Sequence, residues 1–163
     1  MSKRYADICA FIYREARHLD DRNWEAWLEL YAQDAEYWMP AWDDDDQLTD
    51  DPQSQISLIY YPNRNGLEDR VFRIQTERSS ASMPEPRTSH MVANVEVLSE
   101  QGGVVEVRYN FHTLSHRYKE TQNFFGTCFL TLREQADGDF RVARKKIILK
   151  DDYIRQVVDI YHL

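Results

Sequence analysis

Apolar residues in the N-terminal part of the chain recur every three or four positions, which is the spacing of one face of an α-helix. The first apolar stripe comprises Tyr5, Ile8, Ile12, Ala16 and Leu19. It predicts an amphipathic helix that ends near Asp20. The second stripe comprises Trp24, Trp27, Leu28 and Tyr31. With Asn23 as a plausible N-cap, it predicts a second helix that forms a hairpin with the first.

The pattern changes to that of a strand between Ala35 and Met39, and Pro40 ends this strand because proline cannot donate a ladder hydrogen bond. Six of the nine residues from 43 to 51 are aspartates, and their mutual repulsion predicts a solvated loop. Residues 56–61 alternate but are mostly apolar. This stretch fits either a strand or a helical turn.

A third helix is predicted between about residues 66 and 78, where Leu67, Val71 and Ile74 share a face. After this helix, apolar residues recur at every second position, which is the period of a β-strand. Four strands are expected at about residues 88–99, 104–118, 123–134 and 140–150, with glycine-containing turns between several of them. Residues 153–161 fit a final strand or a turn. Helices followed by a long antiparallel meander predict an α+β fold, in which a strongly curved sheet wraps around the N-terminal helices as a cone.

The length and the net charge of the chain restrict the classes of function that it can have. The chain of 163 residues suits a single domain spanning residues 1–163. Its net charge of −8 argues against a nucleic-acid partner. No apolar run approaches the roughly 20 residues that cross a bilayer, and the charged N-terminus is unlike a secretory signal, so we expect a cytoplasmic protein without membrane attachment. Cys9 and Cys128 read as buried thiols.

No motif predicts a cofactor or a metal site in this chain. His112 and His116 lie four residues apart on a predicted strand, which separates them by ~13 Å, too far to share one ion. The two cysteines lack neighbouring ligands for an iron–sulfur centre. The aspartate run lacks the glycine and closing glutamate of a calcium loop. Phosphate-binding glycine motifs and the GxSxG elbow are absent.

A cone can also enclose an apolar pocket, in which desolvation shifts the pKa of a carboxylate or histidine toward catalysis. Such a site would make the chain a free-standing isomerase or dehydratase. The candidates for it are His90, His112 and Asp34. No spacing argument brings these three residues together, and for each of them an ordinary polar role is the simpler interpretation.

Several stretches closely resemble the small (beta) subunits of benzoate- and toluate-type aromatic-ring-hydroxylating dioxygenases. The longest begins YREARHLDDRNWEAWLELYAQDAEYWMPAWDDDD at Tyr13. Others are RTSH from Arg87, VRYNFHTLSHRYK from Val107, NFFGT from Asn123 and KKIILKDDYIRQVVDIYHL from Lys145. The similarity runs essentially end to end, and the variable parts are the N-terminal tip and residues 134–143.

The resemblance implies an NTF2-like (cystatin-like) cone, similar to nuclear transport factor 2 and ketosteroid isomerase. It also implies a hetero-hexamer of three large (alpha) and three small subunits. The complex would use NADH and O2 to cis-dihydroxylate an aromatic carboxylate, with a reductase component acting on the large subunit. The Rieske [2Fe-2S] cluster and the mononuclear non-heme iron would both lie in the large subunit. This chain would then contribute no catalytic residue and would stabilise the trimer of large subunits.

The resemblance extends to benzoate, toluate, halobenzoate and anthranilate enzymes, and it places the substrate pocket in the large subunit. For this chain we predict contacts with partner chains at exposed aromatic and charged residues, because such residues suit a contact rim. The predicted set is Trp42, Asp43, Asp44, Asp45, Asp46, Arg144, Lys145 and Lys146. The alternative is a solvated acidic loop and a basic run that is paired with nearby acids.

Overall fold

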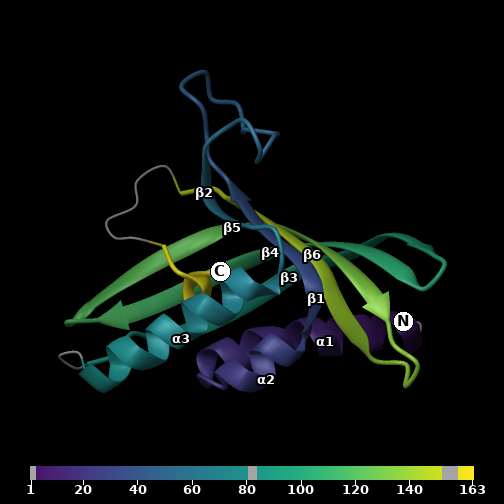
Figure 1. Ribbon diagram of the computed structural model, residues 1–163, viewed down its shortest axis with the longest axis horizontal. Helices are drawn as coiled ribbons and strands as arrows, with labels where there is room; N and C mark the ends of the chain where they lie inside the picture. The colour runs from purple at the N-terminus through teal and green to yellow at the C-terminus, as the bar shows by residue number, and fades with distance from the viewer. Residues whose placement is uncertain (1–2, 81–83, 152–157) are drawn as a thin grey trace.

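The computed structural model describes residues 3–80, 84–151 and 158–163 (Figure 1). Two helices open the chain, and a third separates the first two strands from the remaining four. The elements in order are α1 (Lys3–Asp20), α2 (Trp24–Glu29), β1 (Tyr31–Pro40), β2 (Ser57–Tyr61), α3 (Arg64–Ser80), β3 (Arg87–Gln101), β4 (Val104–Arg117), β5 (Glu120–Glu134), β6 (Phe140–Leu149) and the 3-10 helix η1 (Ile160–His162).

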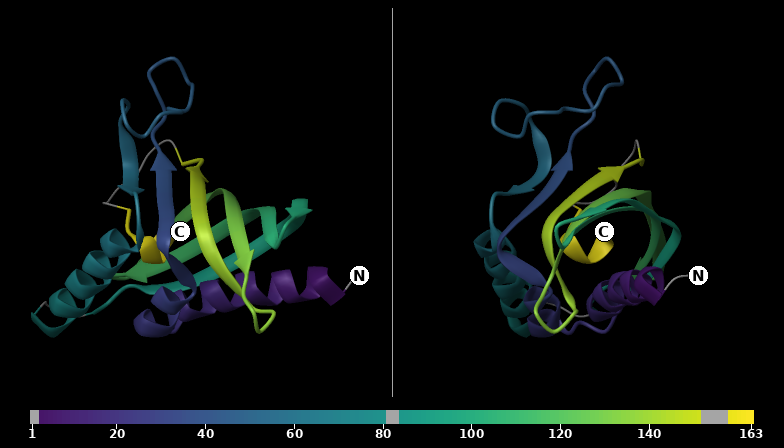
Figure 2. Two further views of the ribbon diagram at one scale, coloured as in Figure 1. Left: turned by 45° about the vertical axis from the view of Figure 1, so that its right-hand side comes forward. Right: turned by 90° about the vertical axis from the view of Figure 1, so that its right-hand side faces the viewer.

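The strands form one six-stranded sheet in the order β2-β1-β6-β5-β4-β3. All neighbours are antiparallel except β1 and β6, which run parallel. The sheet curls strongly, and the helices lie against its concave side (Figure 2). The predicted α+β cone is therefore confirmed.

The inner face of the cone follows from period-two alternation along the strands. Val105, Val107, Tyr109 and Phe111 point inward from β4 and are buried. They belong to the same hydrophobic core as the apolar stripe of α1, in which Ile8, Ile12 and Leu19 are buried. The core thus lies between the sheet and the N-terminal helices, as the two periodicities predict.

The second helix is shorter than its apolar stripe predicts. It ends at Glu29, and Tyr31 is the first residue of β1, aligned with Val142 of β6. The Val142 amide donates to the Leu30 carbonyl at 2.8 Å, so pairing with a distant strand ends the helix. Asn23 occupies the N-cap position, but its side chain makes no capping hydrogen bond.

Three other segments complete the cone. The stretch at 56–61, which fits strand or turn, contains strand β2, antiparallel to β1. The aspartate-rich segment between β1 and β2 projects beyond the sheet as an extended loop (Figure 2). The ambiguous stretch at 153–161 lies largely outside the described residues, and its end forms part of η1. None of the described helices is long and apolar enough to cross a membrane.

Candidate functional site

The interior of the cone holds a buried polar cluster around the Glu15 carboxylate of α1. Oε1 of Glu15 accepts hydrogen bonds from Trp27 Nε1 at 3.0 Å and from the Tyr31 hydroxyl at 2.9 Å. The Lys145 ammonium of β6 donates to the same oxygen at 3.0 Å. The side chains of Lys145 and Glu15 are 1% and 3% exposed, so the ion pair is shielded from solvent.

Burial alone disfavours either charge of this pair. The Lys145 ammonium and the hydrogen bond from Trp27 outweigh desolvation and lower the pKa of Glu15 below its ordinary value. The Glu15 carboxylate likewise outweighs desolvation and raises the pKa of Lys145. Both groups therefore remain ionised at neutral pH. Glu15 is held by three donors, an arrangement suited to fixing α1, α2, β1 and β6 together rather than to transferring a proton.

The C-terminal residues lie inside the wide end of the cone (Figure 2). Ile160 and Leu163 are buried there. Arg70 of α3 forms an ion pair with Asp159, in which Nε donates to Oδ1 at 2.8 Å. Asp159 also accepts from the Ile160 amide at 2.8 Å and so caps η1. The last residues of the chain are thus packed inside the curl of the sheet.

Two histidines fasten this C-terminal segment. The His162 ring stacks on Phe124 with centroids 4.3 Å apart, and its Nδ1 accepts from the Asp159 amide at 2.9 Å. Desolvation lowers the pKa of His162 to about 4, so the ring is neutral at physiological pH. His90 lies 2.5 Å from Asp20 through Nδ1 and 3.1 Å from the Leu163 main-chain oxygen through Nε2.

The three residues considered for an enzymatic pocket serve separate contacts. His90 bridges Asp20 to the C-terminal segment, as described above. Asp34 is exposed and forms a bidentate ion pair with Arg133 at 2.8 and 2.9 Å. His112 is exposed on β4 beside Asn123 Oδ1, at 2.7 Å. The structure does not gather these side chains around one cavity.

Metal-ligating side chains are similarly dispersed. His112 pairs with Phe125 across the sheet and His116 with Thr121, so the two histidines occupy different rungs of the β4–β5 ladder. Cys9 and Cys128 are free and buried, as predicted. Across residues 3–80, 84–151 and 158–163, no group of three or more His, Cys, Asp and Glu side chains is placed to hold a metal ion.

The predicted contact residues divide into surface and interior positions. Trp42 is 43% exposed, and its indole N–H donates to the Leu149 carbonyl at 2.7 Å. The run from Asp43 to Asp46 is exposed. Arg144 and Lys146 point outward from β6, whereas Lys145 points inward to Glu15 because side chains alternate along a strand. Lys145 is therefore an interior residue, and we remove it from the predicted contact set.

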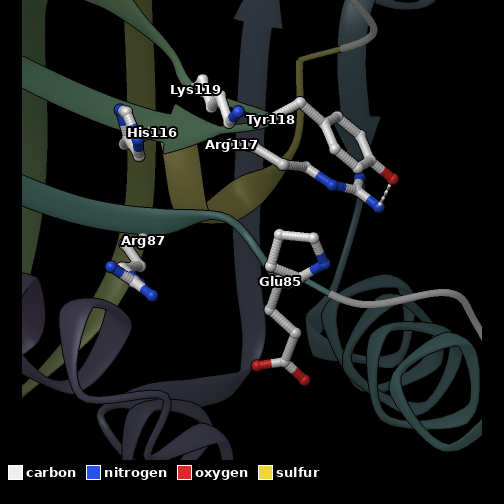
Figure 3. A pocket seen from close by; sticks show the side chains of 7 residues that line it. Glu85, Arg87, His116, Arg117, Tyr118 and Lys119 are labelled. Atoms are coloured by element: carbon white, nitrogen blue, oxygen red, sulfur yellow. Dashed lines mark hydrogen bonds between the residues drawn. The ribbon is translucent and has the colours of Figure 1, made fainter.

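A surface pocket of about 290 Å³ lies at the β4–β5 turn, next to the start of β3 (Figure 3). Its lining consists of Pro84, Glu85, Arg87, His116, Arg117, Tyr118 and Lys119. Arg117 donates to the Tyr118 hydroxyl at 2.8 Å, while Glu85 pairs with Arg22 at 2.9 Å. Three of the seven lining residues are cationic, and Glu85 is acidic. The pocket lies on an exposed turn and does not enclose a substrate for proton transfer.

The sequence contained a signal for the interior cluster that periodicity alone did not resolve. Glu15 lies three residues after Ile12 and four before Leu19, on the buried stripe of α1. A carboxylate on an apolar stripe requires a buried partner. Lys145 lies two residues before Ile147, on the inward face of β6, but reading Arg144 to Lys146 as one basic run concealed this.

Fold and interior together define the class of protein. The chain is an NTF2-like α+β cone whose central carboxylate is sequestered in an ion pair and whose wide end is filled by its own C-terminal residues.

The family model for the ring hydroxylating beta subunit matches residues 14–156. The toluate 1,2-dioxygenase subunit beta of Pseudomonas putida is 59% identical over 163 residues, which cover 100% of both chains. The 2-halobenzoate 1,2-dioxygenase small subunit of Burkholderia cepacia is 53% identical, with 100% of this chain and 98% of that protein covered. This chain therefore belongs to the family of ring-hydroxylating beta subunits.

A solved structure agrees with this assignment. The crystal structure of the benzoate 1,2-dioxygenase beta subunit from Burkholderia mallei superposes with a TM-score of 0.85 at 52% identity. The alignment covers 97% of this chain and 96% of that chain. The cone described above is thus a fold already observed in this family.

Proposed function

We propose that this chain is the small subunit of the terminal oxygenase component of a dioxygenase that acts on an aromatic carboxylate. The observation that carries the proposal is similarity over at least 96% of this chain to the beta or small subunits of toluate, halobenzoate and benzoate dioxygenases. The interior of the cone supports it, because the Glu15 carboxylate is committed to Lys145, Trp27 and Tyr31. The alternative of a free-standing isomerase or dehydratase is less well supported, because His90, His112 and Asp34 serve separate contacts and are not gathered around one cavity.

The role of the chain in this proposal is mechanical. A large subunit would hold the Rieske [2Fe-2S] cluster and the non-heme iron, which supply the electron transfer and the oxygen chemistry. The small subunit would bury part of the large subunit's surface and fix three copies in a ring, giving an α3β3 hexamer. A reductase would pass electrons from NADH to the large subunit. The buried free thiols of Cys9 and Cys128 suit the reducing conditions of the cytoplasm.

The predicted contact set, without Lys145, remains part of this proposal. Trp42 and the run from Asp43 to Asp46 lie on the projecting loop between β1 and β2, and Arg144 and Lys146 lie on the outer face of β6. Trp42 combines an exposed ring with a hydrogen bond that anchors the loop. It is the residue of this set most suited to a fixed contact, since aromatic residues are enriched at interfaces.

Co-expression with a large subunit from the same gene cluster tests the proposal. The two chains should elute together as one heavy species, and iron and Rieske-type absorption should follow the large subunit. The small subunit expressed alone should be colourless and bind no stoichiometric iron. A brown preparation of the small subunit alone would contradict the proposal. So would separate elution of the two chains, and isomerase or dehydratase turnover by a lone small subunit would favour the enzymatic alternative.

A further inference from the structure

The outer face of the sheet is turned away from α1 and α2 (Figure 2). On this face, side chains from five neighbouring strands align in a row. Its members align strand by strand in the backbone register, and side chains aligned in this way share one face of a sheet. The row consists of Arg108, Phe129, Lys146, Trp38 and Tyr60. We refer to these five residues as the cation–aromatic row.

Cations of this face lie over the aromatic rings of the row. The Lys146 ammonium is 4.8 Å from the Trp38 ring centroid, and the Arg144 guanidinium lies over the same ring at 5.4 Å. The Arg108 guanidinium is 6.0 Å from the centroid of Phe129. Trp38 is only 2% exposed although it faces outward, because these cations and its neighbours cover it. The cations and rings of the row therefore pack against one another on this face of the sheet.

In the neighbouring cross-strand row of residues, the charged side chains are paired within this chain. Arg144 pairs with Glu36 at 2.8 Å, and Glu106 accepts from the Thr131 hydroxyl at 3.0 and 2.9 Å. Arg108 has Glu96 at 3.3 Å. Lys146 differs, because no carboxylate within the described part of the chain lies within 4.0 Å of its ammonium. Partial burial and the nearby Arg144 guanidinium lower the pKa of Lys146, and the Asp50 carboxylate, which forms no ion pair with it, offsets them only in part.

We infer that a carboxylate side chain of the large oxygenase subunit docks on Lys146, with flanking apolar atoms packed on Phe129 and Phe125. The inference rests on the proposed function, which supplies the partner. Charge complementarity supports it: the chain has a net charge of −8, so a half-buried unpaired cation stands out as a local site for an acid. Ile148 on the same strand and Phe125, which is 46% exposed, extend apolar surface beside the row.

A charge reversal tests this inference in the assembled oxygenase. Lys146→Glu should weaken the affinity of the small subunit for the large subunit by roughly 30-fold or more, because it places two carboxylates in contact and loses an anchoring contact. Lys119→Glu is the matched control, since it makes the same charge change on the exposed β4–β5 turn. We expect it to change the affinity by about 3-fold at most. Binding is measured by titrating the purified subunits at several salt concentrations.

A milder variant separates docking from folding. Lys146→Met keeps an unbranched chain on Trp38 but removes the charge, so it should weaken binding by about 10-fold and reduce the dependence of affinity on salt. Its melting temperature and circular dichroism should match those of the unmodified protein. If Lys146→Glu does not fold, Lys146→Met decides the question alone.

Three results would overturn the inference. Unchanged affinity of the Lys146 variants, while the unmodified subunit binds, would remove this row from the interface and leave the proposed function intact. Equal losses in the Lys146 and Lys119 variants would indicate a general charge effect. A shift in self-association of the small subunit, without a change in large-subunit affinity, would make the row a contact between copies of this chain. If the unmodified subunit itself does not bind, the proposed function fails instead.

Discussion

The Lys145 ammonium lies 3.0 Å from Oε1 of Glu15, and the two side chains are 1% and 3% exposed. The two residues come from the first helix and the last strand of the sheet, so their contact joins opposite ends of the sequence inside one core. Replacing a buried ion pair by apolar side chains often leaves the stability of a protein unchanged. Removing only one partner leaves the other charge buried without a counter-ion. The pair is thus a constraint on how the core is assembled.

Removal of one charge of this pair should destabilise the folded protein. We expect Glu15→Gln to lower the free energy of unfolding by about 3–5 kcal/mol, because the Lys145 ammonium then lacks a buried counter-ion. The double variant Glu15→Leu with Lys145→Met should lose much less than the sum of the two single changes. Urea denaturation provides the measurement for the unmodified protein, Glu15→Gln, the single variants Glu15→Leu and Lys145→Met, and the double variant. Additive losses would show that the two residues contribute independently.

Trp27 should be among the most sensitive apolar positions of the core. It is fully buried, packs against Tyr31 with ring centroids 4.8 Å apart and donates to Glu15. Trp27→Ala should lower the free energy of unfolding by roughly 3–5 kcal/mol through the cavity it leaves. Tyr13→Ala, at a residue that is 51% exposed, is the control and should change it by about 0.5 kcal/mol or less. A thermal melt that Trp27→Ala does not shift would contradict this placement in the core.

The pH dependence of stability should contain a contribution from His162. Its pKa is about 4 in the folded chain against an ordinary value of 6.5, so the unfolded chain binds the extra proton between these values. Stability therefore falls as the pH drops from 6.5 to about 4, by roughly 3 kcal/mol for this one group. We expect His162→Asn to flatten that part of the curve. Unfolding free energies between pH 4 and 7 test this, and parallel curves for the two proteins would exclude the effect.

Acidic groups with lowered pKa values also contribute to the pH dependence of the unfolding free energy, but only at the lower end of this pH range. Hydrogen bonds and charge from His90 outweigh burial and lower the pKa of Asp20, and Lys145 does so for Glu15. Both carboxylates lose their stabilising contribution as the pH falls through their folded pKa values, below the ordinary acid range. They are present in both proteins, so the difference between the two curves reports His162 alone.

The C-terminal segment should depend on its ion pair with α3. Arg70→Met leaves the Asp159 carboxylate without its guanidinium while Asp159 is only 5% exposed. We expect amide hydrogen exchange at Ile160 and Leu163 to accelerate by about 10-fold or more, while the β4–β5 ladder exchanges as before. Arg73→Met, at an exposed position of the same helix, is the control. Unchanged exchange in Arg70→Met would mean that apolar packing alone holds the segment.

The strands and helices could be predicted from the sequence because their signals are local. Alternation in 104–118 and the three-to-four spacing of Ile8, Ile12 and Leu19 identify faces without knowledge of the partner elements. The end of the second helix could not be predicted in this way. The apolar stripe continues to Tyr31, yet the helix ends two residues earlier, at Glu29. The hydrogen bond from Val142 to Leu30 ends it there, and that contact spans more than half of the chain.

The sequence by itself determined the α+β class, the buried cysteines and the resemblance that identifies the family, since all of these reside in short patterns of residues. Only the tertiary structure decided which charges face inward. Arg144, Lys145 and Lys146 are neighbours of like charge in the sequence, but a strand turns successive side chains to opposite faces and α1 brings Glu15 to the middle one. The burial of a charge depends on a partner that is distant along the chain, so it is settled when helix and sheet pack together.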